Sequence, residues 1–189
     1  EPHILGGDIS GDIVEVGSEV TRLAVGERVV VNPRLTCRQC PTCLAGQTEL
    51  CERPGMIGST VNGGYAELAI APAANCVTLA DGLSYELAAS LPTVFLPCWS
   101  ILMRHGVLRP WETVLVLSAS SGVGTAGIQL AKNVVGSRVI TTTSTAEKAE
   151  KAKALGADEV INYKEEDIAD RVKKITGGRG VDVVIDHVG

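Results

Sequence analysis

Four cysteines lie close together in the first half of the chain: Cys37, Cys40, Cys43 and Cys51. This spacing brings four thiolates within reach of one ion. A zinc site closed by four thiolates is tetrahedral and leaves no position open for a substrate. We therefore predict one structural zinc ion, which would hold the lobe formed by residues 33–54.

Two other uses of the four cysteines remain open, a pair of disulfides or an iron–sulfur cluster. Disulfides are typical of small secreted domains, whereas this chain has the character of a cytosolic protein. A bacterial cluster motif has a shorter last gap and a proline after its fourth cysteine, where this chain has Glu52. Zinc is therefore the preferred interpretation.

The remaining cysteines and the histidines show no ligand spacing. Cys76 and Cys98 stand alone, and we interpret them as inert buried thiols rather than nucleophiles. His3, His105 and His187 each lack a partner at ligand spacing, so structural roles are preferred to catalytic ones.

A second stretch suited to chemistry runs from Thr113 to Val134. An apolar run predicts a buried strand at 114–117, small residues predict a turn at 118–124, and an apolar helical pattern follows. A turn between a strand and a helix gathers unpaired N–H groups at the positive end of the helix dipole, so it attracts a phosphate. Taken alone, the same turn could be a structural connection only.

The glycines of this turn can be aligned with the dinucleotide-binding fingerprint in more than one way. Gly122-Val-Gly124-Thr-Ala-Gly127 spells G-x-G-x-x-G, but the first glycine of that fingerprint belongs where the strand ends, near Ala119. We therefore interpret the motif as Ala119-Ser120-Ser121-Gly122-Val123-Gly124, with alanine and serine in place of its first two glycines. Gly124 then permits close packing of helix and strand, and Gly127 is an ordinary small residue of the helix.

The elements around this turn alternate between strand and helix. Strands are predicted at 113–118, 138–143, 159–162 and 181–186, and helices at 122–134, 146–155 and 165–175, ended by Gly156 and by Gly177-Gly178. This alternation indicates an α/β fold with a parallel sheet and right-handed crossovers. In that setting, the turn after the first strand is where the pyrophosphate of a dinucleotide binds.

The end of the second strand indicates which dinucleotide is bound. NAD sites usually place an acidic residue there to bind the ribose 2′-hydroxyl, but this chain has threonines and a serine at 141–145. The hydroxyls of Thr143 and Ser144, together with Lys148, are available to bind a 2′-phosphate. The alternative is that Lys148 is a solvated helix residue like Lys151 and Lys153. We predict NADP(H).

The first half of the chain has the pattern of β-structure. Strands are expected at Ile9–Val16, Arg28–Val31 and, after the turn 62–64, Tyr65–Ile70. Short strands with glycine turns suggest a small barrel or sandwich. Because the pattern changes near Val94, we predict two domains, 1–93 and 94–189.

The composition sets outer limits on function. The chain has 189 residues, 45% of them hydrophobic, and a net charge of −5, which suits a soluble globular protein and argues against a nucleic-acid surface. The apolar stretch 87–103 is broken by Pro92 and Pro97, so no membrane span is predicted. A cytoplasmic location is expected. The chain starts at Glu1 rather than Met and ends on a strand-like run, so we expect a fragment cut at both ends.

Several motifs together resemble those of the medium-chain dehydrogenases/reductases, with the quinone oxidoreductase branch the most similar. They are Gly6-Gly7-Asp8 with Gly11 and Val16-Gly17, the cysteine lobe, Gly63-Gly64-Tyr65-Ala66-Glu67, Ser121-Gly122-Val123-Gly124 with Ile128-Gln129-Leu130-Ala131-Lys132, and Ala154-Leu155-Gly156-Ala157 with Val160-Ile161-Asn162-Tyr163. The resemblance implies a partial GroES-like β-domain followed by a partial Rossmann doubly wound parallel sheet. It also implies that Lys148 and Tyr163 help to hold a 2′-phosphate, and that the protein is a homo-oligomer, either a dimer or a tetramer.

Departures from the family pattern concern the catalytic metal. Zinc alcohol dehydrogenases of the family have Gly-His-Glu where this chain has Gly6-Gly7-Asp8, and a ligand cysteine where it has Thr93. A three-ligand catalytic zinc is therefore not expected, and the Lewis acid that activates an alcohol is missing. Pro97 stands where many relatives have a threonine near the nicotinamide.

The predicted function is an oxidoreductase in which NADPH delivers hydride to a quinone or an α,β-unsaturated carbonyl without a catalytic zinc. Such small molecules accept hydride without metal activation, and the cofactor carries the chemistry. No residue is assigned as proton donor. Two alternatives stay open: a zinc-dependent alcohol dehydrogenase, and a non-catalytic NADPH-binding protein.

Overall fold

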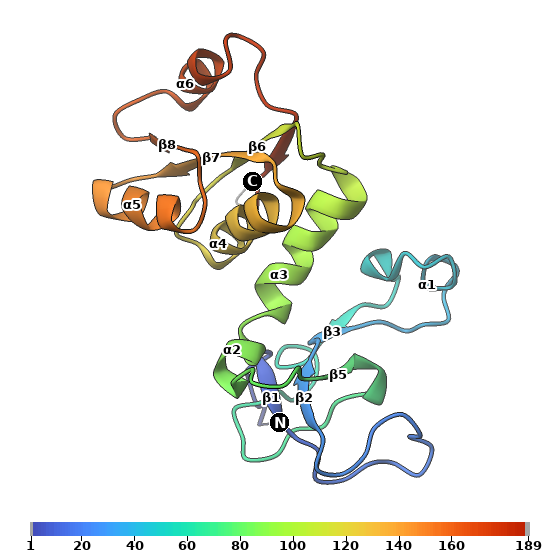
Figure 1. The fold of residues 1–189 in the computed structure, drawn as a ribbon. Coiled ribbons are helices and arrows are strands. Elements are labelled where there is room, and N and C mark those ends of the chain that lie inside the picture. Colours follow the sequence, from blue (N-terminus) through green and yellow to red (C-terminus); the bar gives the residue numbers. More distant parts are fainter. Residues whose placement is uncertain (1, 188–189) are drawn as a thin grey trace. The chain divides into compact units, whose positions relative to one another are not determined.

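A computed structural model describes residues 2–187, and the chain divides into two compact units, Glu1–Thr93 and Val94–Gly189 (Figure 1). No helix in the described part of the chain is long and apolar enough to cross a membrane. Each unit has its own sheet and its own core of buried side chains.

The first unit is built on an antiparallel sheet in the order β1-β2-β5. Its elements are β1 (Ile9–Asp12), β2 (Arg28–Val31), β3 (Arg34–Leu35), α1 (Pro41–Leu44), η1 (Thr48–Leu50), β4 (Gly55–Met56), η2 (Ala73–Asn75), β5 (Cys76–Thr78) and α2 (Tyr85–Ala89). In β2, Val29 and Val31 point into the core beside Leu23 and Ile57, because successive strand residues face opposite sides.

Two predictions for this unit are wrong. Residues 65–70 form no strand, and Tyr65 and Ile70 are 81% and 93% exposed. Apolar alternation makes a strand only where a neighbouring strand pairs with it, and within residues 2–187 the only backbone hydrogen bond of this segment runs from the N–H of Tyr65 to the carbonyl of Leu5. The first strand ends at Asp12 rather than Val16, because its partner β2 begins only at Arg28, directly after the turn at Gly26.

The helix α2 was not expected in this β-rich half of the chain. It begins after Ser84, whose hydroxyl accepts a hydrogen bond from the N–H of Leu87. A serine cap of this kind satisfies one of the free donors of a first helical turn. The cap therefore explains how a helix of only five residues forms at this point.

The second unit contains a parallel sheet in the order β8-β7-β6-β9, which confirms the predicted α/β fold. Its elements are α3 (Pro92–Trp99), which begins at the end of the first unit, η3 (Ser100–His105), β6 (Thr113–Val116), α4 (Gly122–Gln129), η4 (Leu130–Val135), β7 (Arg138–Thr143), α5 (Ala146–Ala154), β8 (Glu159–Asn162), α6 (Ile168–Ile175) and β9 (Val183–Ile185). The chain moves outward from β6 to β8 and then returns to the other side of β6. The strand order therefore reverses beside β6, at the kind of place where open α/β sheets bind their ligands.

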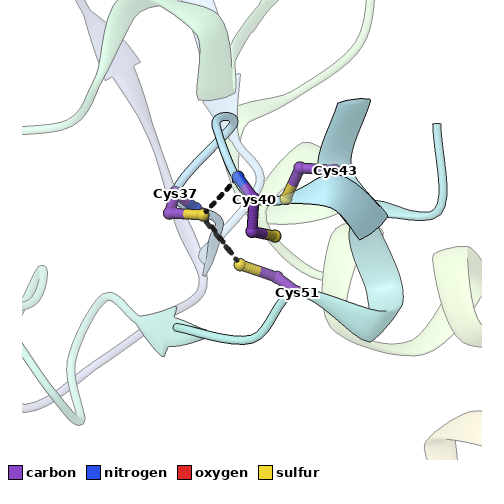
Figure 2. A group of neighbouring side chains, drawn as sticks. All are labelled: Cys37, Cys40, Cys43 and Cys51. Carbon is purple, nitrogen blue, oxygen red and sulfur yellow. Dashed lines mark hydrogen bonds between the residues drawn. The ribbon is translucent and has the colours of Figure 1, made fainter. Parts of the chain in front are cut away.

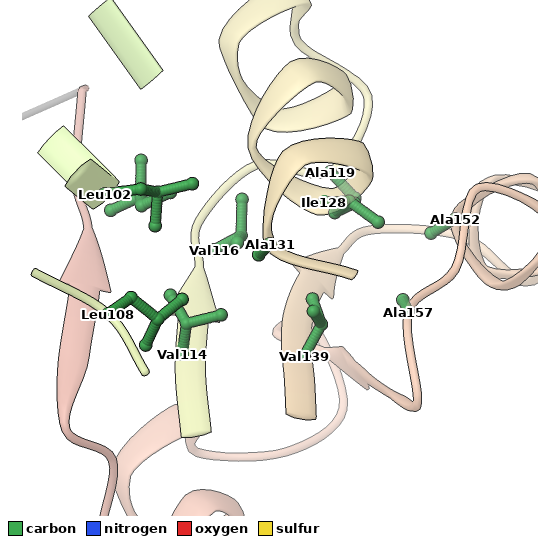
Figure 3. Close-up of a cluster of buried hydrophobic side chains, with 11 residues drawn as sticks. Leu102, Leu108, Val114, Val116, Ala119, Ile128, Ala131, Val139, Ala152 and Ala157 are labelled. Atoms are coloured by element: carbon green, nitrogen blue, oxygen red, sulfur yellow. The ribbon is translucent and has the colours of Figure 1, made fainter. Parts of the chain in front are cut away.

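Both faces of this sheet are covered by helices, α4 and α5 on one side and α6 on the other (Figure 1). The strand β6 shows the consequence, because Val114 and Val116 join the cluster under α4 with Ile128 (Figure 3). Leu115 points the opposite way and packs with Val172 of α6. A strand buried on both faces is a nearly continuous apolar run, as β6 is from Val114 to Val116.

The predicted strands and helices of this unit are all present, but several of their boundaries differ. β6 ends at Val116 rather than at residue 118, and the helix predicted at 122–134 is divided into α4 and η4. β7 and β8 have the predicted bounds, and α5 ends before Gly156, which has a φ of 115°. α6 begins at Ile168 rather than at residue 165, since Asp167 caps it by accepting from the N–H of Asp170. β9 is shorter than predicted, at Val183–Ile185.

The helix α4 lies against β6 because two glycines remove side chains from the contact. A Cβ atom on Gly124 would lie 2.1 Å from the carbonyl oxygen of Ser118, which has a left-handed φ of 59°. A Cβ atom on Gly127 would lie 3.1 Å from Ile185 and 3.3 Å from Val116. Gly127 is therefore not the ordinary helix residue that the sequence suggested, because it too packs closely on the sheet.

We expect Gly124→Ala to destabilise the protein by about 2–3 kcal/mol, since the added methyl group collides with rigid backbone. The matched control is Gly17→Ala, where a Cβ atom would meet only Val20, at 3.9 Å. Thermal and urea unfolding of the two variants measure the difference. Equal stability of the two would contradict the packing described for the turn.

Candidate functional site

The four cysteines of the lobe converge on one point (Figure 2). Their sulfur atoms all lie within 4.8 Å of one another, and the Sγ atoms of Cys37 and Cys51 are 3.6 Å apart. Zinc–sulfur bonds of about 2.3 Å give a tetrahedron with edges of about 3.8 Å. The cluster therefore fits a tetrahedral zinc ion, and its spacing is too wide for a disulfide of about 2.05 Å.

Local sequence places these side chains. Arg38, with a left-handed φ of 57°, turns the chain between the first two cysteines. Pro41 then begins α1 directly after Cys40, which places Cys43 one turn along the helix. The short helix η1 returns the chain, so that Cys51 faces the other three. The sequence prediction of these four residues as one group is matched by the geometry.

The thiols differ in how readily they ionise. Backbone N–H groups of Gln39 and Cys40 donate to the sulfur of Cys37 and lower its pKa to about 6. Burial, helped by the neighbouring thiols, raises the pKa of Cys43 to about 12. Four thiolates at this spacing repel one another, so a bound cation is what allows all four to be deprotonated together.

The two cysteines outside the lobe are buried thiols. Cys98 is completely buried, and burial raises its pKa to about 11. Burial likewise raises the pKa of Cys76. Because a nucleophilic cysteine must be a thiolate, neither is suited to attack a substrate at neutral pH.

A second candidate site lies at the carboxyl ends of the parallel strands. Ser121 caps α4, and its hydroxyl oxygen accepts from the N–H of Gly124 at 2.9 Å. The N–H groups of Gly122 and Val123 have no hydrogen-bond partner among residues 2–187. Ala119 is anchored by a hydrogen bond from its N–H to the carbonyl of Thr142. Two free donors therefore stand at the positive end of the α4 dipole, ready for an anion.

β7 ends in three consecutive threonines beside this turn, and their hydroxyl groups differ in their hydrogen-bond partners. The hydroxyl of Thr141 donates to the carbonyl of Val116 at 2.7 Å, and that of Thr142 accepts from the N–H of Ser118 at 3.0 Å. Thr143 is 3% exposed, yet within the described chain its hydroxyl has no partner. An unpaired buried polar group costs about 1–3 kcal/mol. Thr143 therefore marks a place where a polar ligand would be stabilising.

The other predicted dinucleotide residues lie around the same end of β7. Tyr163 follows β8, and its N–H donates to the carbonyl of Thr143 at 3.1 Å, while half of the residue is exposed. Ser144 is partly buried in the loop between β7 and α5. Ser120, exposed, completes the turn after β6. Their assignment as cofactor contacts stays a prediction.

Lys148 differs from the other lysines of α5. The ammonium of Lys151 pairs with Glu147 at 2.7 Å, and that of Lys153 pairs with Glu150 at 3.0 Å. Lys148 has no hydrogen-bonded or ion-paired acceptor for its ammonium in the described structure. It is thus the lysine of this helix that remains available to an anionic ligand.

Two contacts were not foreseen from the sequence. The hydroxyl of Thr93 donates to a carboxylate oxygen of Asp8, and both residues are exposed in the first unit. The Nε2 atom of His187 lies 2.9 Å from the hydroxyl of Ser121, at the turn after β6. Each contact joins residues that are far apart in the chain, so spacing gave no signal. For the contact of His187, the only available signal was its position just after β9, at the edge where open α/β sheets bind ligands.

Comparisons with known proteins agree with this architecture. The family model for the alcohol dehydrogenase GroES-like domain matches residues 1–81, and the model for zinc-binding dehydrogenase matches residues 122–189. The first match lies in the first compact unit and the second match in the second unit, and residues 82–121 lie outside both matches.

Three relatives illustrate the similarity. An alcohol dehydrogenase of Geobacillus stearothermophilus is 40% identical over 97% of this chain and 54% of its own length. A quinone oxidoreductase-like protein 2 homolog of Nematostella vectensis is 34% identical over 100% of this chain and 44% of its own. A crystal structure of an NAD-dependent alcohol dehydrogenase is 45% identical, with a TM-score of 0.94, over 100% of this chain and 55% of its own. The chain thus spans about half the length of the relatives it matches.

We expect one zinc ion per chain by elemental analysis, and its loss in the variant Cys37→Ser, because a hydroxyl is a poor substitute for a thiolate ligand. The matched control is Cys76→Ser, which changes a buried thiol outside the lobe and should retain the metal. Zinc that survives in Cys37→Ser, or a content of two ions per chain, would contradict a single structural site.

Proposed function

Because this chain belongs to the medium-chain dehydrogenase/reductase superfamily, we propose that its protein is an oxidoreductase that binds a nicotinamide dinucleotide at the carboxyl edge of the parallel sheet. The site offers the two free N–H groups of Gly122 and Val123 to a pyrophosphate, at the end of a helix dipole. The buried, unpaired hydroxyl of Thr143 offers a partner to the adenosine ribose. The bound dinucleotide would supply the hydride, and the protein would orient it and exclude water.

We propose further that hydride goes to a quinone or an α,β-unsaturated carbonyl without a catalytic zinc. The observation that carries this is the hydrogen bond from Thr93 to Asp8, two positions that the family resemblance matches to a cysteine and a glutamate of zinc alcohol dehydrogenases. The family's histidine ligand corresponds to Gly7, the residue before Asp8. A Cβ atom on Gly7 would lie 3.1 Å from the carbonyl oxygen of Ile57. Electron-poor acceptors suit such a site, because they need no Lewis acid.

The residue types available for a metal support the same proposal. Within residues 2–187, the cysteine cluster is the only group of three or more potential ligands close enough to share an ion. A catalytic zinc needs three protein ligands and an open position, whereas the cluster is closed by four thiolates. The metal held by this cluster would therefore be structural.

NADPH is the proposed dinucleotide. The end of β7 carries no acidic residue, and Thr143, Lys148 and Tyr163 lie around it. An acid at this place would favour the ribose 2′-hydroxyl of NADH and repel a 2′-phosphate. The free ammonium of Lys148 would pair with that phosphate.

A zinc- and NAD-dependent alcohol dehydrogenase is the second candidate, and the similarity to alcohol dehydrogenases, one of them NAD-dependent, favours it. Gly7 has no side chain, and Thr93 offers neither sulfur nor imidazole, so that activity would need other zinc ligands. It would also place NAD(H) against the threonines that end β7. Metal content and cofactor preference thus separate the two candidates.

We expect the purified protein, at one zinc per chain, to oxidise NADPH with a simple quinone or an enone such as methyl vinyl ketone. Ethanol or butanol with NAD⁺ should give no reaction above background, since no Lewis acid lowers the pKa of the alcohol. Absorbance of the reduced nicotinamide measures both reactions. Alcohol oxidation accompanied by a second zinc ion would favour the alternative, and NADPH binding without turnover of any acceptor would indicate a binding protein.

We expect Lys148→Ala to weaken NADPH binding about tenfold while NADH binding stays unchanged, because a charge-assisted contact to the 2′-phosphate is lost. The matched control is Lys151→Ala, on the same helix, whose ammonium already pairs with Glu147. Isothermal titration calorimetry gives both dissociation constants. An equal loss for the two dinucleotides would exclude a role of Lys148 in choosing between them.

A further inference from the structure

Ser121 stands where the dinucleotide motif normally has its second glycine. A glycine at this place lets the backbone approach the pyrophosphate, so a side chain here is a potential obstacle. In this chain the hydroxyl of Ser121 is turned back onto its own turn. It lies 2.9 Å from each of three atoms: the carbonyl oxygen of Ser118, the nitrogen of Gly124 and Nε2 of His187.

The donors and acceptors at this hydroxyl can be counted. A serine hydroxyl has one hydrogen to donate and two lone pairs to accept with. The N–H of Gly124 takes one lone pair, and the hydrogen of the hydroxyl points to the carbonyl of Ser118. The contact with His187 is then a hydrogen bond only if Nε2 carries a proton and donates it to the second lone pair. All three contacts are satisfied in that state, and the hydroxyl has no free capacity left.

The position of His187 follows from the sheet. β9 pairs with β6 so that Ile185 is opposite Val116, and the N–H of Leu117 donates to the carbonyl of Ile185. His187, two residues beyond Ile185, therefore leaves the sheet beside the turn that begins with Ser118. This is the place where the strand order reverses, and the buried, unpaired hydroxyl of Thr143 is an independent sign of a ligand at this edge.

We infer that His187 is a positioning residue of the dinucleotide site, which holds the Ser121 hydroxyl against the helix cap through Nε2–H. With the hydroxyl fixed, the N–H groups of Gly122 and Val123 stay open to the pyrophosphate although a serine replaces the motif glycine. The imidazole thus compensates for a side chain that would otherwise obstruct the turn. This inference rests on the proposed dinucleotide site and assigns a function to a histidine that sequence spacing left without one.

The test is a set of variants at His187, each made with Ser121 and with Ser121→Gly. In the Ser121 background, we expect His187→Ala to weaken NADPH binding about fivefold, the scale of one hydrogen bond. His187→Gln should restore most of the affinity, because the glutamine amide nitrogen reaches the position of Nε2, whereas the shorter amide of His187→Asn should not. In the Ser121→Gly background, His187→Ala should change the dissociation constant less than twofold, since no hydroxyl remains to be held.

Calorimetric titration with NADPH and NADH measures these constants, and thermal unfolding checks that each variant is folded. Equal affinity of the parent protein and His187→Ala would overturn the inference, because the cap hydrogen bond to Gly124 would then suffice. A loss that persists in the Ser121→Gly background would also overturn it, since His187 would act on the ligand directly or on the fold. Failure of the parent protein to bind either dinucleotide would instead overturn the proposed function itself.

Discussion

The contact between Gly124 and the carbonyl of Ser118 is the constraint on which the second unit depends. Ser118 adopts a left-handed conformation, and its carbonyl oxygen occupies the space where a Cβ atom of residue 124 would be. This close approach allows α4 to start directly over the end of β6. The free donors of Gly122 and Val123 and the positive end of the dipole come together only because the helix starts there. The geometry of the candidate anion site is thus a consequence of backbone packing.

The lobe of the first unit depends on a different interaction. Its buried cluster consists of the cysteines themselves, with Cys40, Cys43 and Cys51 buried and Cys37 packed against them. An apolar core of that size contributes little to stability. Metal–thiolate bonds can replace such a core, because their binding free energy becomes folding free energy. A metal bound by these four cysteines would therefore stabilise the lobe whether or not the protein also holds a catalytic metal.

The sequence predicted those features whose partners are close in the chain. The four cysteines span fifteen positions, and the strand, turn and helix of the motif are contiguous, so spacing was sufficient. Residues 65–70 were wrongly predicted as a strand. A strand forms only beside a strand that pairs with it, and the local apolar pattern does not identify that partner. The contacts of Thr93 with Asp8 and of His187 with Ser121 join residues 85 and 66 positions apart. Only the folded chain brings such pairs together.

The threonine–aspartate pair has a consequence for the chemistry of the site. A zinc ion polarises a carbonyl by its charge, whereas a hydroxyl that donates to Asp8 has already committed its single hydrogen. Thr93 can therefore accept a hydrogen bond from a substrate but cannot stabilise a developing oxyanion unless its contact with Asp8 is exchanged. A substrate that needs strong activation gains little from such a pair. If the proposed function is correct, the Thr93–Asp8 pair would therefore suit acceptors whose electron deficiency is intrinsic, because it offers no strong activation of a carbonyl.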